Sequence, residues 1–149
     1  MGNVTVDFKE LKRFAEQLNS LNQEKINEFN EAAVKRLAGE LLRNVKMNTP
    51  IGQYPSGSGK VGGTLQSGWT VGEVVRDGDT FIIEVFNPVE YASYVEFGHR
   101  IMGGEGRTET VGFKEGRFMM TVAADELRVN APQILEEKLL KFMESIFDE

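Results

Sequence analysis

Apolar side chains recur every three or four residues through residues 7–47. The first series is Leu11, Phe14, Ala15, Leu18 and Leu21, and the second series is Ile26, Phe29, Ala33, Leu37, Leu41 and Val45. This spacing places each series on one face of an amphipathic helix. Because residues 19–22 interrupt the register, the sequence predicts a short helix followed by a long one. The residue before a proline avoids the helical conformation, so the long helix is expected to end at Thr49-Pro50.

Two glycine-rich segments predict loops. Residues 52–63 read G-Q-Y-P-S-G-S-G-K-V-G-G, and residues 101–107 read I-M-G-G-E-G-R. Glycine, serine and proline at this density are typical of flexible loops. Both loops are expected to be mobile in the free protein and to become ordered when partners bind.

Between and after these loops, shorter patterns predict strands. Apolar residues alternate imperfectly over 69–75 and 81–85, which indicates two strands. The Asp77-Gly78 pair between them is typical of a tight hairpin turn. Residues 108–113 are expected to form a third strand.

The last part of the chain, residues 117–147, again has helical periodicity. Pro132 is expected to kink or split this helix, because proline lacks the N–H group that the helix needs. An apolar stripe near its end belongs either to the core or to a surface that docks on a partner. This stripe comprises Leu139, Phe142, Met143, Ile146 and Phe147.

A short helix with signals at both ends is expected at residues 88–97. Asn87 can cap it through its side-chain oxygen, and Pro88 suits the first helical position. Glu90 stands where a capping-box carboxylate reaches back, and Gly98 can end the helix in a left-handed conformation. The order of elements predicts an α+β fold: a long N-terminal helix, a small antiparallel sheet, a short central helix and a long C-terminal helix.

The short helix carries three aromatic side chains, those of Tyr91, Tyr94 and Phe97. Three aromatic side chains can bury far more surface than so short a helix requires for its own packing. They are therefore expected to pack either into the core or against a neighbouring subunit. Glu96 either pairs with Arg100 and caps the turn, or contacts another subunit.

Composition narrows the class of protein. At 149 residues, the chain is expected to form one domain, residues 1–149. Hydrophobic and charged contents of 40% and 27% are ordinary for a soluble globular protein. A net charge of −6 argues against a domain that wraps nucleic acid, because such domains are usually basic. No signal peptide and no membrane span are expected.

Two motif matches fail for lack of context. Residues 57–62 fit G-x-G-x-x-G, but a dinucleotide site needs a strand before the turn and a helix after it. Glu96 and His99 have the E-x-x-H spacing of carboxylate-bridged iron sites, but His99 is the single histidine and no second pair exists. There is no cysteine to act as a nucleophile or thiolate ligand. The sequence therefore predicts no cofactor, no metal site and no enzyme.

Residues 91–100, Y-A-S-Y-V-E-F-G-H-R, resemble a signature of tailed-bacteriophage minor tail components, which include head-to-tail joining and tail-completion proteins. The recurrent pattern is Tyr-Ala-x-Tyr-Val-Glu-Phe-Gly, followed by Thr or His and a basic residue. Residues 49–52 and 63–69 are similar to the family's Thr-Pro-Val-x-Thr-Gly-x-Leu-x-x-Ser-Trp, and residues 116–118 open a long C-terminal helix. The resemblance spans roughly residues 10–147, with an insertion at 53–62.

The resemblance implies a structural protein of the virion neck, made in the host cytoplasm. It implies a homo-oligomeric, hexameric ring that contacts the tail-tube terminator and the connector or head-completion proteins. DNA would pass without sequence-specific binding, and acidic walls would repel its phosphates. The alternatives are a tail terminator, another minor tail component, or a soluble non-viral binding module.

Two sets of residues follow from this interpretation. The structural signature comprises Trp69, Asn87, Pro88, Tyr91, Tyr94, Phe97 and Gly98. The hypothetical interface comprises Tyr54, Lys60, Glu96, His99, Arg100, Met102 and Arg107. Arg100 is expected to bind a carboxylate of a neighbouring subunit, because arginine can hold carboxylates with two parallel hydrogen bonds.

Overall fold

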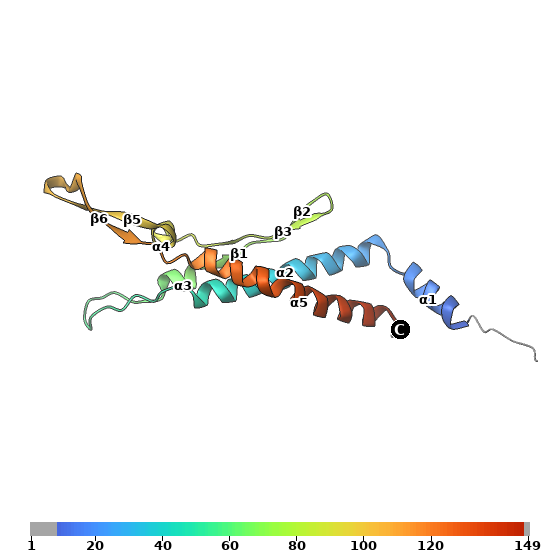
Figure 1. Cartoon of the computed structure of the whole chain (residues 1–149). Coiled ribbons are helices and arrows are strands. Elements are labelled where there is room, and N and C mark those ends of the chain that lie inside the picture. The colour runs from blue at the N-terminus through green and yellow to red at the C-terminus, as the bar shows by residue number, and fades with distance from the viewer. Residues whose placement is uncertain (1–8, 148–149) are drawn as a thin grey trace, which may run out of the picture.

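The computed structural model describes residues 9–147. Two long helices lie side by side and form an elongated body (Figure 1). The ribbon at residues 98–115 and the loop at 52–63 project beyond one end of it, whereas the hairpin at residues 70–86 lies along the helix at residues 23–47. The strands pair only as two-stranded antiparallel ribbons. The predicted α+β fold is thus confirmed, with three separate ribbons in place of one small sheet.

The N-terminal part of the chain forms the two predicted helices. Helix α1 spans Lys9–Asn19 and helix α2 spans Gln23–Met47. The side chain of Asn22 caps α2 by accepting a hydrogen bond of 3.0 Å from the backbone N–H of Lys25. Helix α2 ends before Thr49-Pro50, as predicted from the proline.

Helix α5 spans Met119–Phe147 and packs along α2. It continues through Pro132, so the predicted split is wrong. Proline removes one backbone hydrogen bond, whereas packing along α2 supports the whole length of α5. Near its end, the Phe142 ring lies 4.8 Å from that of Phe29. The Phe147 ring stacks on Phe14 at 5.2 Å, so the last aromatic residue docks on the chain's own α1.

The predicted strands at 69–75 and 81–85 each break into two short pieces. Strand β1, Thr70–Val71, pairs with β4, Val85–Phe86. Strand β2, Val75–Asp77, pairs with β3, Thr80–Ile82, and Gly78 turns the hairpin between them with φ of 60°. The predicted hairpin is therefore confirmed, and a hydrogen bond of 2.8 Å from the Gly72 N–H to the Glu84 carbonyl continues the β1–β4 pair toward it.

The third ribbon corrects the prediction of a loop at 101–107. Strand β5, Gly98–Gly103, pairs with β6, Glu109–Glu115, and a 3-10 turn, η1, spans Glu105–Arg107 between them. The glycines of this segment lie at the turn of a hairpin rather than in an open loop. We call residues 98–115 the arm. A short helix that was not predicted, α3 (Thr64–Gly68), follows the loop at 52–63, which contains no helix or strand.

The centre of the core lies where α2, α3 and α5 meet. Its buried residues are Val45, Leu65, Trp69, Met119 and Ala123. The Trp69 Nε1–H donates a hydrogen bond of 2.8 Å to the Thr49 hydroxyl, which itself donates one of 2.6 Å to the Val45 carbonyl. This relay ties the end of α2 to the chain after α3.

Replacing Trp69 with phenylalanine should lower the free energy of unfolding by about 1–2 kcal/mol, because the buried Thr49 hydroxyl loses its donor and a small void forms. Urea denaturation followed by circular dichroism measures this loss. In the Trp69→Phe/Thr49→Val double variant, the two losses should not add, because both remove the same hydrogen bond. Full additivity would show that the relay contributes nothing.

Candidate functional site on the signature helix and the arm

Helix α4 spans Ala92–Phe97 and begins later than the predicted start at residue 88. Asn87 does not cap it. The Asn87 side-chain oxygen accepts a hydrogen bond of 3.0 Å from the Val89 N–H, and its nitrogen donates one of 2.8 Å to the Leu65 carbonyl. Asn87 therefore forms a local turn and ties α4 to α3. Asparagine side chains commonly compete with helix in this way.

Gly98 ends α4, as predicted, but its φ of 83° and ψ of 175° differ from the left-handed helical conformation that was expected. This positive φ combined with an extended ψ is a region that only glycine enters readily. The backbone also passes close to the far strand here. A Cβ atom on Gly98 would lie 2.3 Å from the Lys114 carbonyl oxygen, and one on Gly116 would lie 2.3 Å from that of Glu96. The end of α4 and the root of the arm are thus in backbone contact.

Glu96 does not make the contact with Arg100 that was predicted within the chain. It is buried, and its carboxylate accepts hydrogen bonds of 2.9 and 3.0 Å from the backbone N–H groups of Met120 and Thr121. It also accepts one of 2.8 Å from the Thr121 hydroxyl. These N–H groups belong to the first turn of α5, where backbone N–H groups have no carbonyl acceptor within the helix. Glu96 therefore caps α5 from outside, where the helix dipole favours a negative charge.

Replacing Glu96 with alanine should lower the free energy of unfolding by about 2–3 kcal/mol, because the start of α5 loses a charged acceptor. Thermal melting and urea denaturation measure the effect. Glu90→Ala is the matched control, because Glu90 is an exposed carboxylate just before α4, the helix that carries Glu96. This variant should change the free energy of unfolding by less than about 0.5 kcal/mol. Equal losses of stability in the two variants would show that Glu96 does not stabilise the start of α5.

The three aromatic side chains of residues 91–97 are exposed, so the interpretation that places them in the core is wrong. The exposed fractions are 46% for Tyr91, 58% for Tyr94 and 66% for Phe97. The core face of α4 consists instead of Ala92 and Val95. The small Ala92 and the branched Val95 fill the contact between α4 and the core, so the three aromatic rings lie on the outer face of α4. The interpretation that remains is contact with another subunit.

The arm extends this apolar surface away from the body (Figure 1). Four of its large apolar side chains are exposed: Ile101, Met102, Val111 and Phe113. Within residues 9–147, β5 and β6 pair only with each other, so no other strand lies along either outer edge of the ribbon. A lone two-stranded ribbon is marginally stable in water, so a partner on this surface would stabilise it.

The predicted interface residues of the arm lie along this ribbon. His99 is on β5, with its ring 5.7 Å from that of Tyr94, and Arg100 is opposite Phe113. Met102 follows a bulge in the ribbon, and Arg107 ends the 3-10 turn at the tip with φ of 54°. Arg100 therefore lies on a strand and not at the start of a loop.

Tyr54 and Lys60 lie in the loop that projects at the same end as the arm (Figure 1). The Lys60 ammonium lies 5.7 Å from the centre of the Tyr54 ring, within reach of a cation–π interaction. Between this loop and α4 is a cavity of about 240 Å³, whose lining includes Tyr54, Tyr91 and Val95. The loop, α4 and the arm thus bring the predicted residues to one end of the molecule, except Glu96, which is buried in the cap.

Sequence reasoning missed most of the apolar surface of the arm. Val111 and Phe113 lay in the predicted third strand but were not recognised as exposed, because a strand pattern alone does not show whether another layer covers it. Phe118 is also exposed and has φ of 51°, at the point where the chain leaves the arm for α5. A positive φ at a non-glycine residue gives no signal in the sequence.

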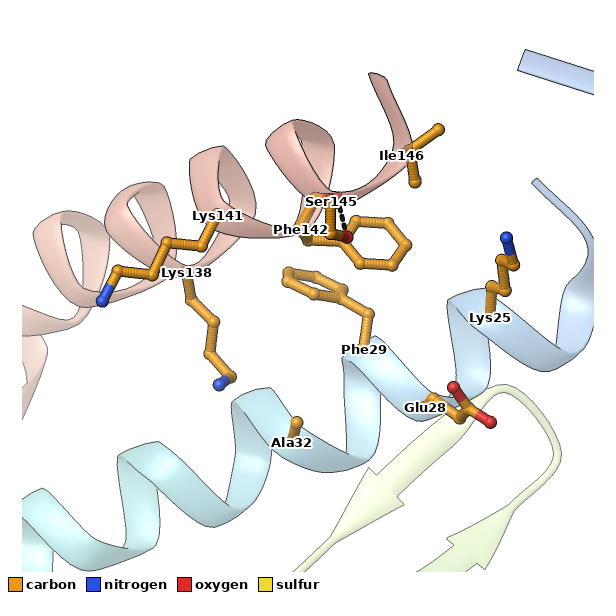
Figure 2. A pocket seen from close by; sticks show the side chains of 9 residues that line it. All are labelled: Lys25, Glu28, Phe29, Ala32, Lys138, Lys141, Phe142, Ser145 and Ile146. Atoms are coloured by element: carbon orange, nitrogen blue, oxygen red, sulfur yellow. Dashed lines mark hydrogen bonds between the residues drawn. The ribbon is translucent and has the colours of Figure 1, made fainter. Parts of the chain in front are cut away.

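A second concavity, of about 430 Å³, opens between α2 and α5 at the other end of the body. Figure 2 shows Phe29 and Phe142 facing each other in it, with Lys25, Lys138 and Lys141 around them. Among the described residues that line it, Glu28 is the only carboxylate. The Ser145 hydroxyl donates a hydrogen bond of 2.6 Å to the Phe142 carbonyl.

Two properties of residues 9–147 bear on other classes of site. No group of three or more His, Cys, Asp or Glu side chains lies close enough to hold a metal ion. None of the helices in this range is long and apolar enough to span a bilayer.

Comparison with protein families gives a match over residues 12–98, more than half of the chain. The family is HK97-gp10-like, with the description "Bacteriophage HK97-gp10, putative tail-component". The match begins in α1 and ends at Gly98, so the arm beyond Gly98 and α5 lie outside it. Comparisons with curated proteins and with solved structures gave no match. The chain therefore belongs to the HK97-gp10-like family of bacteriophage tail components.

Proposed function

We propose that this tail component joins the head to the tail, or completes the tail, as one subunit of a homo-oligomeric ring in the virion neck. Its role is structural and not enzymatic. The observation that supports this most directly is the exposed aromatic face of α4, because Tyr91, Tyr94 and Phe97 have no covering layer within residues 9–147.

Exposed apolar surface of this extent is typical of sites for protein partners. The row of rings on α4 continues into the four exposed apolar side chains of the arm, so the surface runs over two consecutive elements. Aromatic residues are also the side chains that most often dominate binding at protein interfaces. The surface therefore fits stable contacts within a multi-subunit particle.

The partners that we propose are neighbouring copies in a hexameric ring, the tail-tube terminator, and the connector or head-completion proteins. The chain would assemble in the host cytoplasm before it becomes part of the virion. Its net charge of −6 suits a conduit, because acidic walls do not hold the phosphates of passing DNA.

Complementation tests this proposal. Particles assembled without the protein should contain filled heads and separate tails, and adding the purified protein should restore joined, infectious particles. Electron microscopy of the restored particles should show a ring of this protein between head and tail. Joined particles that form equally well without the protein would overturn the proposal, as would its location at the distal tip.

A further inference from the structure

The strands of the arm are the longest in the part of the chain that the structure describes. Strands β1 to β4 have two or three residues each, whereas β5 has six and β6 has seven. No third strand of residues 9–147 lies along either outer edge of the arm. Native proteins commonly keep exposed edge strands very short, because an open edge is a template for pairing with another chain. The arm therefore offers its longest edges where only another polypeptide can pair with them.

The register of the arm places apolar side chains on both of its faces. Cross-strand partners share a face, and so do alternate residues of one strand. Phe113, which is opposite Arg100, therefore lies on the same face as Glu115, which is opposite Gly98. Ile101, the next residue of β5, lies on the other face. Both apolar side chains are exposed, so a strand added beside the arm would cover part of each face.

The two edges of the arm differ in charge. In β5, Arg100 is the only residue among Asp, Glu, Lys and Arg, whereas β6 contains two glutamates and one lysine. Arg100 and Glu115 are exposed, and no ion pair joins them within the chain. Opposite charges on neighbouring strands stabilise a sheet, and like charges destabilise it. The charges therefore favour pairing of β5 with a β6 edge over pairing of β5 with another β5.

The symmetry of a ring supplies this pairing of unlike edges. Arms that are related by rotation about the ring axis point the same way, so the strand beside β6 of one copy is β5 of the next, and the two run antiparallel. A contact between unlike surfaces of identical subunits closes into a ring when the rotation allows it. The arm projects beyond the end of the α2–α5 body, so it can lie beside the arm of another copy (Figure 1).

We propose that β6 of one copy adds along β5 of the next by antiparallel backbone pairing, so that the arms of a ring form one continuous belt of strands. The inference rests on the proposed ring and specifies what closes it. The pairing uses the regular root of the arm, residues 98–101 and 112–115, because a bulge between Ile101 and Met102 interrupts the register farther out. Backbone hydrogen bonds supply the affinity. Arg100 of one copy beside Glu115 of the next selects which edges meet.

Cross-linking between two variants tests which edges meet, and the absence of cysteine allows single reactive positions. His99→Cys and Lys114→Cys, with tags of different mass, are mixed in equal amounts and added to particles lacking the native protein. Joined particles are purified and treated with dibromobimane, which links only thiols a few ångströms apart. Covalent heterodimers should form, because opposite positions on neighbouring strands lie about 5 Å apart. Each variant alone should give none, because identical positions of adjacent copies are two strands, about 10 Å, apart.

A mixture of Val129→Cys with Lys114→Cys is the control and should give no heterodimer, because Val129 lies on α5. Homodimers from His99→Cys or Lys114→Cys alone would show that like edges meet. Joined particles without heterodimers would show that β6 of another copy does not lie along β5. Either result would overturn the inference, and the second would leave the proposed joining function intact.

Charge reversal tests the contact between copies independently. Arg100→Glu and Glu115→Arg should each reduce joining at least about tenfold, because like charges then lie side by side. An equal mixture of the two should restore joining, since alternating copies pair opposite charges at every contact of an even-numbered ring, although each arm keeps its own mismatch. Lys141→Glu, which makes the same change in net charge as Arg100→Glu on an exposed position of α5, should have no effect.

Two results of the charge reversal would contradict the inference. One is normal joining by both single variants, and the other is a mixture that joins no better than either variant alone. Failure of the native protein to join particles would instead contradict the proposed function itself.

Discussion

Replacing Gly98 with alanine is expected to lower the free energy of unfolding by more than about 3 kcal/mol. Two causes combine. The φ of 83° with an extended ψ is strained for any residue with a Cβ, which costs about 1–3 kcal/mol. The new methyl would also lie 2.3 Å from the Lys114 carbonyl oxygen and 2.8 Å from the Gly116 nitrogen, so backbone must move. Chemical denaturation measures the loss, and Gly98→Val should be worse.

Gly57 is a matched control for this prediction. Its φ is 82°, almost the same as that of Gly98, but a Cβ there would meet no atom within 4 Å. Gly57→Ala therefore introduces a positive-φ penalty without the overlap, and it should destabilise the protein by at most about 1–2 kcal/mol. If the two variants are equally destabilised, the close approach of the arm to α4 is not what requires glycine at position 98.

The long helices could be predicted from the sequence because their signals are local. The periodicity of the apolar residues marks the faces of α1, α2 and α5, and Asn22 and Thr49-Pro50 mark the limits of α2. The hairpin at Asp77-Gly78 was recognisable for the same reason, since its turn needs a glycine with positive φ. The split that was one of two expected outcomes at Pro132 is wrong, because packing along α2 outweighs one lost hydrogen bond.

The candidate site was harder to predict because its contacts join distant parts of the chain. Glu96 caps a helix that begins 23 residues later, at Met119, and no local spacing reveals this. Asn87 has the sequence of a helix cap, but its side chain bonds to Leu65, and this contact exists only once α3 has formed. The resemblance of residues 91–100 identified the right segment but could not assign a role to each side chain within it.

Exposure was the other property that the sequence could not establish. A short helix with three aromatic residues suggests either core or interface, and only the fold shows that Ala92 and Val95 fill the core side. The glycine-rich segment 101–107 suggested a loop, because the strand that pairs with it comes later in the chain. Once β5 and β6 pair, the same residues become a projecting ribbon with apolar side chains on its surface.

The exposed rings lead to the prediction with the largest expected effect on function. Tyr94→Ser/Phe97→Ser should leave the stability of the isolated protein within about 1 kcal/mol of the native value, because neither ring is covered within residues 9–147. The same variant should lose attachment to its partners by at least about 2 kcal/mol, roughly a thirtyfold drop in affinity, because buried aromatic anchors dominate binding at interfaces. Thermal melting and particle complementation measure the two effects separately.

Val129→Ser is the control for this variant, since Val129 is 79% exposed on α5 and is also a large apolar side chain on the surface. It should change neither stability nor joining, which would show that the loss depends on where apolar surface is removed and not merely on how much. A large fall in the melting temperature of Tyr94→Ser/Phe97→Ser would assign the two rings to the fold of the single chain. Normal joining by that variant would mean that the rings do not contact a partner, and the arm alone would then carry the interface.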